Sequence, residues 1–161
     1  MDLNIKENKM KIYLAGDCST ENRYDMVQIA KLFREYGKYE VYCPWELKIE
    51  NAWNMPQEEW AQKVFEADIK AIQECDIFFM ISQGRKSTAG TNWENGYAYG
   101  LNKTIITLQI TDEPTSLMTY CSADEFFVCN KNKNTYYDML RFIIDTLEMR
   151  SKKQRCQTVL T

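Results

Sequence analysis

The sequence predicts an α/β protein, a doubly wound parallel sheet of five strands with helices on both faces. Short apolar runs alternate along the chain with longer segments that repeat apolar residues every three or four positions, which indicates strands joined through helices. The run Asp76–Ser82 is apolar almost throughout, as expected for a strand covered on both faces. Strands joined through helices pair in parallel, and the flavodoxin-like strand order 2-1-3-4-5 is the expected arrangement.

Two strands and two helices alternate in the first half of the chain. Lys11–Gly16 is a short apolar run that ends in glycine, and it is the first predicted strand. Glu21–Tyr36 carries an apolar stripe at helical spacing and is followed by glycine, a common residue after a helix. Tyr39–Cys43 is a second strand that ends before a proline, and Pro56–Cys75 is a long amphipathic helix with proline in its first turn.

The same alternation continues from the third strand, Asp76–Ser82. Apolar spacing predicts a helix over Thr91–Asn102 and another over Thr135–Arg150, at the end of the chain. Between them, Thr104–Ile110 and Glu125–Cys129 are the fourth and fifth strands, and a further short helix fits between these two strands.

Composition excludes several classes of protein. The 161 residues suit one domain over residues 1–161, with residues 1–10 and 151–161 as flexible or peripheral tails. Histidine is absent, which excludes a Ser-His-Asp triad and an HExxH zinc site, and the six cysteines form no C-x-x-C pair. We therefore expect no metal and no cofactor. The net charge of −3 and the lack of a long apolar run predict a cytoplasmic protein that binds neither a nucleic-acid polymer nor a membrane.

One carboxylate falls among the core-facing positions of the second predicted helix. The apolar stripe of that helix includes Val64 and Ile72, and Asp68 lies four residues from each of them. A carboxylate in such a position is costly unless it is paired or lines a polar cavity, so Asp68 is a candidate functional group. The alternative is an aspartate at the edge of the stripe that reaches solvent or a backbone N–H.

Two more candidates lie near the edge where the carboxyl ends of strands one and three meet. Thr91-x-x-Glu94 matches a capping box, which is a complete structural explanation for Glu94. A carboxylate in the first turn of a helix is also kept ionised by the helix dipole, and an ionised carboxylate suits nucleophilic attack on a sugar. Tyr13, in the first strand, is either a core residue with its hydroxyl satisfied or a polar group of the same edge.

These candidates belong to a longer pattern. The string KIYLAG, then Asp68 ahead of the DIFFMIS strand, then GTxxExGYA over residues 90–98 together resemble the nucleoside 2-deoxyribosyltransferase superfamily. That superfamily also contains the 2'-deoxynucleoside 5'-phosphate N-hydrolases. The similarity extends over residues 11–127, in the family's order and spacing.

The resemblance implies a role for each candidate. Glu94 matches the nucleophile that forms a covalent glycosyl-enzyme intermediate at C1'. Asp68 matches the carboxylate that contacts the base and protonates it as it leaves, and an acid in that role needs a raised pKa. Tyr13 matches the tyrosine that orients the nucleophile. The resemblance also implies a homodimer or higher homo-oligomer in which one subunit completes the site of the next.

Two positions depart from the transferase pattern. Transferases of this superfamily commonly carry Asp at the position of Thr88 and an Asn from a neighbouring subunit at the position of Ser116. The N-hydrolases carry serines that bind the 5'-phosphate at both positions, and hydroxyls can donate to a phosphate that an Asp would repel. Asp17 stands where the hydrolases have another phosphate-binding serine, which opposes this interpretation. Candidate substrate contacts are Gly16, Asp17, Ser19, Arg23, Thr88, Gly90, Thr91, Ser116 and Met118.

The leading interpretation is cleavage of the N-glycosidic bond of a 2'-deoxynucleoside or its 5'-monophosphate, with transfer of the sugar to another nucleobase. One alternative is a 2'-deoxynucleoside 5'-monophosphate N-glycosidase, and another is a nucleotide-binding or signalling module without turnover. Met118 and Tyr120, beside Ser116, are apolar enough for a subunit interface or for the core. Trp45, Trp53 and Trp60 are candidate stacking surfaces for the base or residues of the core.

Overall fold

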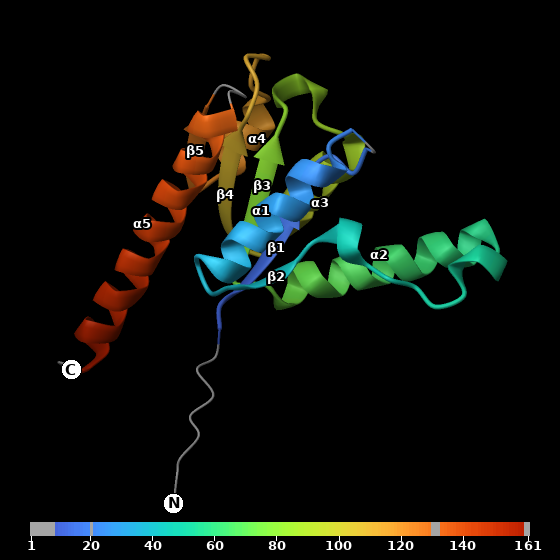
Figure 1. Cartoon of the computed structure of the whole chain (residues 1–161), viewed down its shortest axis with the longest axis horizontal. Coiled ribbons are helices and arrows are strands. Elements are labelled where there is room, and N and C mark those ends of the chain that lie inside the picture. Colours follow the sequence, from blue (N-terminus) through green and yellow to red (C-terminus); the bar gives the residue numbers. More distant parts are fainter. Residues whose placement is uncertain (1–8, 20, 130–132, 160–161) are drawn as a thin grey trace, which may run out of the picture.

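Five parallel strands form one sheet in the order β2-β1-β3-β4-β5, which confirms the predicted topology (Figure 1). The computed structural model describes residues 9–19, 21–129 and 133–159. Each strand lies within its predicted range. The strands are β1 (Lys11–Ala15), β2 (Glu40–Tyr42), β3 (Ile77–Ser82), β4 (Thr104–Gln109) and β5 (Glu125–Val128).

Helices connect the strands as predicted, with differences at their ends. The helix α5 continues to Val159 rather than ending at Arg150, so the backbone of residues 151–159 extends this helix. The helix α3 begins before the predicted Thr91, and the short helix α4 fills the connection before β5. The helices are α1 (Arg23–Glu35), α2 (Gln57–Glu74), α3 (Ala89–Gly100), α4 (Leu117–Ser122) and α5 (Lys133–Val159), with short 3-10 turns at Pro44–Glu46, Ala52–Asn54 and Gly84–Lys86.

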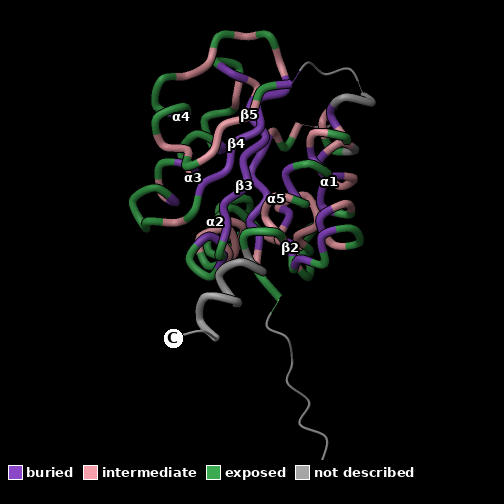
Figure 2. Tube along the Cα trace, turned by 90° about the vertical axis from the view of Figure 1, so that its left-hand side faces the viewer, coloured by how far each residue is buried: buried purple, intermediate pink, exposed green. Residues whose placement is uncertain are grey.

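The sheet is buried between two layers of helices (Figure 2). Because successive strand residues face opposite sides, Ile12 and Leu14 of β1 pack with α1 and α5, in one apolar cluster. Tyr13 and Ala15 point to the other face and join a second cluster with residues of α2 and α3. Each large apolar side chain buried in this way contributes roughly 1.5–3 kcal/mol. The alternation therefore directs Tyr13 toward the two helices that carry the candidate carboxylates.

Only the C-terminal half of α2 packs on the sheet. Figure 1 shows α2 projecting beyond the other elements at its N-terminal end. Ile72 and Cys75 are buried, but Ala61 is exposed and the side chain of Phe65 is 49% exposed. The apolar stripe of α2 therefore continues beyond the core, because the helix is longer than the sheet face that it covers. Asp68 lies where the helix reaches the sheet.

None of the helices described here is long and apolar enough to cross a membrane.

Candidate active site

Tyr13 is held in a stack of aromatic rings across three strands. Its neighbours in strand register are Tyr42 on β2 and Phe78 on β3. The Tyr13 ring stacks on both of them, with centroid distances of 5.3 Å to Tyr42 and 5.4 Å to Phe78. Its hydroxyl donates a hydrogen bond of 2.9 Å to Oε1 of Glu94 on α3. The sheet thus fixes the position of the hydroxyl that holds Glu94.

The start of α3 corrects the interpretation of Glu94 as part of a capping box. The N-cap is Thr88, whose Oγ1 accepts from the backbone N–H of Thr91 at 3.3 Å. Glu94 consequently lies in the second turn, away from the unpaired N–H groups of the first turn. Its side chain instead points to Tyr13 on the sheet, and a capping role for Glu94 is excluded.

Glu94 is also less acidic than the sequence predicts. Burial, together with the nearby charge of Asp68, raises the pKa of Glu94 from 4.5 to about 7, although the hydrogen bond from Tyr13 opposes this shift. The expectation that a helix dipole keeps Glu94 ionised is therefore wrong, because the group lies beyond the first turn and is withdrawn from water. With a pKa of about 7, the neutral and ionised forms of the Glu94 carboxyl group are both populated near neutral pH.

The second carboxylate, Asp68, pairs with a tyrosine that the sequence analysis did not select. The hydroxyl of Tyr42 donates to Oδ1 of Asp68 at 2.7 Å. Burial raises the pKa of Asp68, and the hydrogen bond from Tyr42 opposes the rise. The raised pKa agrees with the expectation for a group that donates a proton. Burial raises the pKa of Tyr13, and the nearby charges of Glu94 and Asp68 raise it further, so the three predicted catalytic side chains lie together.

The loop after β1 contacts the start of α3. The hydroxyl of Thr91 donates to the carbonyl oxygen of Gly16 at 3.0 Å, which ties the loop after β1 to the first turn of α3. Asp17 accepts hydrogen bonds from the Ser19 backbone N–H at 2.8 Å and from the Asn22 side chain at 2.8 Å. The carboxylate of Asp17 therefore shapes its own loop, as aspartates in turns commonly do.

Comparison with known proteins decides the family. The sequence profile of the nucleoside 2-deoxyribosyltransferase family matches residues 12–146. The chain belongs to this family. A search of curated proteins finds no match.

Solved structures agree with the family assignment. A 2-deoxyribosyltransferase from Bacillus psychrosaccharolyticus is 30% identical, with 73% of this chain and 85% of that chain covered and a TM-score of 0.62. A CMP N-glycosidase from Clostridium botulinum is 22% identical, with 87% and 98% covered and a TM-score of 0.53. A conserved protein from Enterococcus faecalis is 18% identical, with 91% and 99% covered and a TM-score of 0.53. The last two share the fold, whereas the family match indicates deoxyribosyltransferase-like chemistry at an N-glycosidic bond.

In this member of the deoxyribosyltransferase family, the aromatic and basic candidates of the sequence analysis do not gather at the carboxylates. Arg23 lies over the ring of Trp45, with 5.2 Å between the guanidinium carbon and the ring centroid, in a cation–π contact. Trp45 itself packs against the α1 and α5 cluster. Trp53 is fully exposed and Trp60 is 43% exposed. A stacking role for these tryptophans stays a prediction.

The candidates near α4 lie on an exposed surface. Ser116 is the N-cap of α4, and its side chain makes no capping hydrogen bond. Met118 is 81% exposed and Tyr120 is 58% exposed, so the alternative that they belong to the core is wrong for the single chain. The helix is anchored to α3 by a hydrogen bond of 2.7 Å between Asn95 and Ser122. Gly90, in the first turn of α3, has open space where a side chain would begin.

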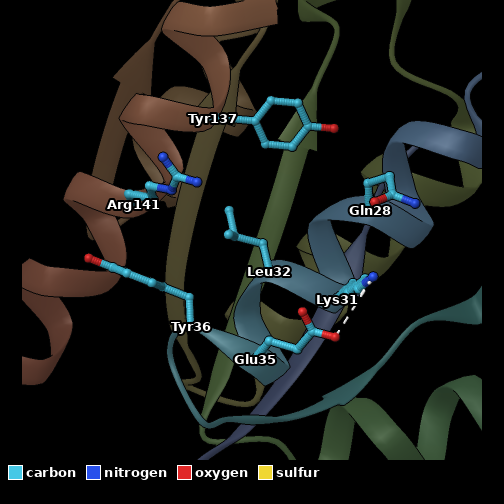
Figure 3. Close-up of a pocket in the computed structure, with 7 residues that line it drawn as sticks. All are labelled: Gln28, Lys31, Leu32, Glu35, Tyr36, Tyr137 and Arg141. Carbon is cyan, nitrogen blue, oxygen red and sulfur yellow. Dashed lines mark ion pairs between the residues drawn. The ribbon is translucent and has the colours of Figure 1, made fainter.

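A separate hollow lies on the opposite face of the sheet from Tyr13 (Figure 3). It has a volume of about 430 Å³ and is formed by α1 and α5. Lys31 pairs with Glu35 at its rim. The hollow is lined by Gln28, Lys31, Leu32, Glu35, Tyr36, Tyr137 and Arg141. Since the sheet separates it from both carboxylates, it is not part of the candidate active site.

Tyr42 is the site residue that sequence reasoning missed. It lies within the predicted strand Tyr39–Cys43, where the sequence pattern assigns no role to its hydroxyl. The signal was available in the pairing of the strands: β1 and β2 are parallel neighbours, and the register places Tyr42 beside Tyr13. A polar tip next to a predicted catalytic tyrosine, on the same face of the sheet, would have identified it.

Proposed function

We propose that the protein cleaves the N-glycosidic bond of a 2'-deoxynucleoside through a covalent glycosyl-Glu94 intermediate and transfers the deoxyribosyl group to another nucleobase. The family sets the type of bond. The observation that supports the mechanism is the pair of carboxyl groups, Glu94 and Asp68, that Tyr13 and Tyr42 hold on one face of the sheet. A pair of carboxyl groups on one face of the sheet can supply the nucleophile and the acid that cleavage of a glycosidic bond requires.

The first half of the reaction uses each group once. Tyr13 holds Oε1 of Glu94, which directs the other oxygen of the ionised carboxylate toward C1' of the sugar. As the bond from C1' to this oxygen forms, the bond from C1' to the base nitrogen breaks. Asp68 gives its proton to the departing base, so that the base leaves neutral and Asp68 becomes a carboxylate.

The second half reverses the roles. An incoming nucleobase attacks C1' from the face that the first base left, and the ester bond to Glu94 breaks. Asp68 accepts the proton from the attacking nitrogen, which restores the starting protonation of both carboxyl groups. Two displacements at C1' give overall retention of configuration. If water replaces the incoming base, the same groups produce hydrolysis.

The direct experiment incubates the protein with deoxynucleosides and with their 5'-monophosphates, with and without a free base, and separates the products. Base exchange that depends on Glu94, absent in Glu94→Ala, is the expected result. Free deoxyribose or its phosphate, with no exchange, identifies the hydrolase alternative. No turnover of any substrate contradicts the proposal and supports a binding module.

One further observation favours the 5'-monophosphate as a substrate. Thr88 stands where transferases of the superfamily carry Asp, so this position brings no carboxylate that would repel a phosphate. Hydrogen bonds from the Ser19 N–H and the Asn22 side chain hold the Asp17 carboxylate within its own loop, although its charge still opposes a phosphate. We therefore expect monophosphates to be accepted at least as well as nucleosides.

The structure limits how Thr88 takes part. Thr91 donates its hydroxyl proton to Gly16, so the 2.8 Å contact between the two threonine hydroxyls uses the proton of Thr88. The Thr88 hydroxyl is thus used in capping α3 and does not donate to a phosphate. Its effect on phosphate binding is that it carries no charge, unlike the Asp of the transferases. Asp and Asn cap helices as well as Thr does. We expect Thr88→Asp to lower kcat/KM for the monophosphate relative to the nucleoside, and the uncharged control Thr88→Asn to leave this ratio unchanged. Equal ratios in Thr88→Asp and Thr88→Asn would show that the residue at position 88 does not distinguish a 5'-phosphate from a 5'-hydroxyl.

A further inference from the structure

We propose that Tyr42 is a positioning residue for the leaving-group acid: it holds Oδ1 of Asp68 and leaves Oδ2 to deliver the proton. This inference rests on the proposed function, because it assumes that Asp68 is the acid. Tyr42 would then do for Asp68 what Tyr13 does for Glu94.

Tyr13 and Tyr42 have matching positions on neighbouring strands and matching hydrogen bonds. They are register partners on adjacent parallel strands, and their rings stack with 17° between the planes. Side chains of register partners leave the same face of a sheet, so both hydroxyls reach the α2 and α3 layer. Tyr13 donates to Glu94 at 2.9 Å, and Tyr42 donates to Asp68 at 2.7 Å. The spacing of the strands therefore sets the spacing of the two carboxyl groups.

Asp68 needs such a contact more than a residue in the middle of a packed helix does. Its helix leaves the sheet within one turn of Asp68, where Phe65 is already half exposed. Among the residues that the structure describes, only the Tyr42 hydroxyl donates to the Asp68 carboxyl group, and Oδ2 has no donor. Loss of this contact would free the carboxyl group to rotate, and a misplacement of about 1 Å can cost about 10²-fold in rate.

The pKa of Asp68 depends on the Tyr42 hydroxyl and on the other titratable groups that surround it. The titratable groups that face Asp68 are Tyr42 from β2, Tyr13 from β1, Glu94 from α3 and Cys18 from the loop after β1. Both tyrosines have raised pKa values, and the pKa of the Cys18 thiol is raised by partial desolvation and by the nearby carboxylates, although the residue reaches the surface. These three groups therefore stay neutral at working pH, which leaves Glu94 as the one neighbour that changes charge.

Removal of the Tyr42 hydroxyl has a predictable sign. A donor stabilises the carboxylate form, and the Tyr42 hydrogen bond lowers the pKa of Asp68 against the effect of burial. In Tyr42→Phe the pKa of Asp68 rises, and the acid keeps its proton to a higher pH. A role for Tyr42 in packing alone predicts no such shift, since phenylalanine keeps the ring that stacks on Tyr13.

The test compares wild type, Tyr42→Phe and Tyr36→Phe. The last is a matched control because the Tyr36 hydroxyl also donates to an aspartate, Asp145, at 2.9 Å, but does so between α1 and α5. The first measurement is the pH profile of kcat, which requires Glu94 ionised and Asp68 protonated, so that its limbs report the two carboxyl groups together. We expect Tyr42→Phe to lower kcat about tenfold or more with little change in KM, and to shift the pH profile to higher pH because the pKa of Asp68 rises. Tyr36→Phe should match wild type.

The second measurement needs no turnover. Carboxyl-carbon NMR titration follows Asp68 directly, with its signal assigned by its loss in Asp68→Asn. A midpoint for Asp68 that is higher in Tyr42→Phe than in wild type and Tyr36→Phe supports the proposal. An unchanged midpoint, or a pH profile that does not move, overturns it.

Failure of this inference is distinguishable from failure of the proposed function. If Glu94→Ala retains turnover or wild type has none, the proposed function fails and the NMR titration still decides whether Tyr42 sets the protonation of Asp68. If Glu94→Ala is inactive and Tyr42→Phe resembles wild type in both measurements, only the role of Tyr42 is wrong.

Discussion

The burial of Glu94 predicts that this residue destabilises the fold above neutral pH. The pKa of Glu94 is raised from 4.5 to about 7 by burial and by Asp68. A group whose pKa is higher in the folded protein than in the unfolded chain favours unfolding once the unfolded chain can ionise. The cost is absent below about pH 4.5, grows between the two pKa values and is complete above about pH 7.

The magnitude follows from the size of the shift. Each pKa unit corresponds to about 1.4 kcal/mol, so the shift of Glu94 amounts to about 3 kcal/mol at pH 8. The substitution Glu94→Gln removes the ionisation but keeps the shape and an oxygen that accepts from Tyr13. We therefore expect this variant to be inactive and also more stable than wild type at pH 8, by up to about 3 kcal/mol.

Urea unfolding at a series of pH values between 4.5 and 8.5 measures the difference. The advantage of Glu94→Gln should grow with pH and level off above pH 7.5. The control Glu50→Gln removes an exposed carboxylate from the turn before Ala52–Asn54, and its stability curve should run parallel to that of wild type. Two parallel curves for Glu94→Gln and wild type, or a less stable Glu94→Gln variant at pH 8, would refute the reasoning about burial.

Three further expectations concern the reaction and the assembly. Asp68→Asn cannot donate a carboxylic proton, so the rate should fall by roughly 10²–10⁴, and by less for bases that leave easily; an equal loss for good and poor leaving groups would make Asp68 a binding residue. Tyr13→Phe removes the donor to Glu94, so the pKa of Glu94 rises and the pH profile of kcat/KM should shift to higher pH; an unchanged profile would show that the hydroxyl does not act on Glu94. Analytical ultracentrifugation should find a dimer or a larger homo-oligomer, and a fully active monomer would contradict the shared site that the resemblance implies.

The topology was predictable because it depends on patterns that repeat over many residues. Alternating apolar runs and amphipathic segments predict all five strands, and the expected order for strands joined in this way, 2-1-3-4-5, is the one that the structure shows. The start of α3 was not predictable in the same way. Both Thr88 and Thr91 are good N-cap residues, and only the contacts of the folded chain select Thr88. The interpretation of Glu94 as an ionised capping residue failed with that choice.

Asp68 shows a second limit of prediction from sequence, because periodicity within a helix does not reveal its tertiary contacts. Periodicity placed Asp68 on the face of α2 that meets the sheet, but it could not reveal that the N-terminal half of the helix projects beyond the sheet. The partner of Asp68, Tyr42, comes from β2, and its contact depends on strand register and not on sequence spacing. Local patterns therefore found the carboxyl groups, whereas the hydrogen bonds that hold them needed the tertiary structure.

The most direct test of the mechanism is to look for a sugar on Glu94. A 2-fluoro-2-deoxyribosyl nucleoside destabilises the oxocarbenium-like transition state and should slow release of the intermediate. After incubation and proteolysis, mass spectrometry should find the fluorodeoxyribosyl mass on the peptide that contains Glu94, and the adduct should be absent in Glu94→Gln. An adduct on another residue, or turnover of deoxynucleosides by Glu94→Ala without any adduct in wild type, would contradict Glu94 as the nucleophile.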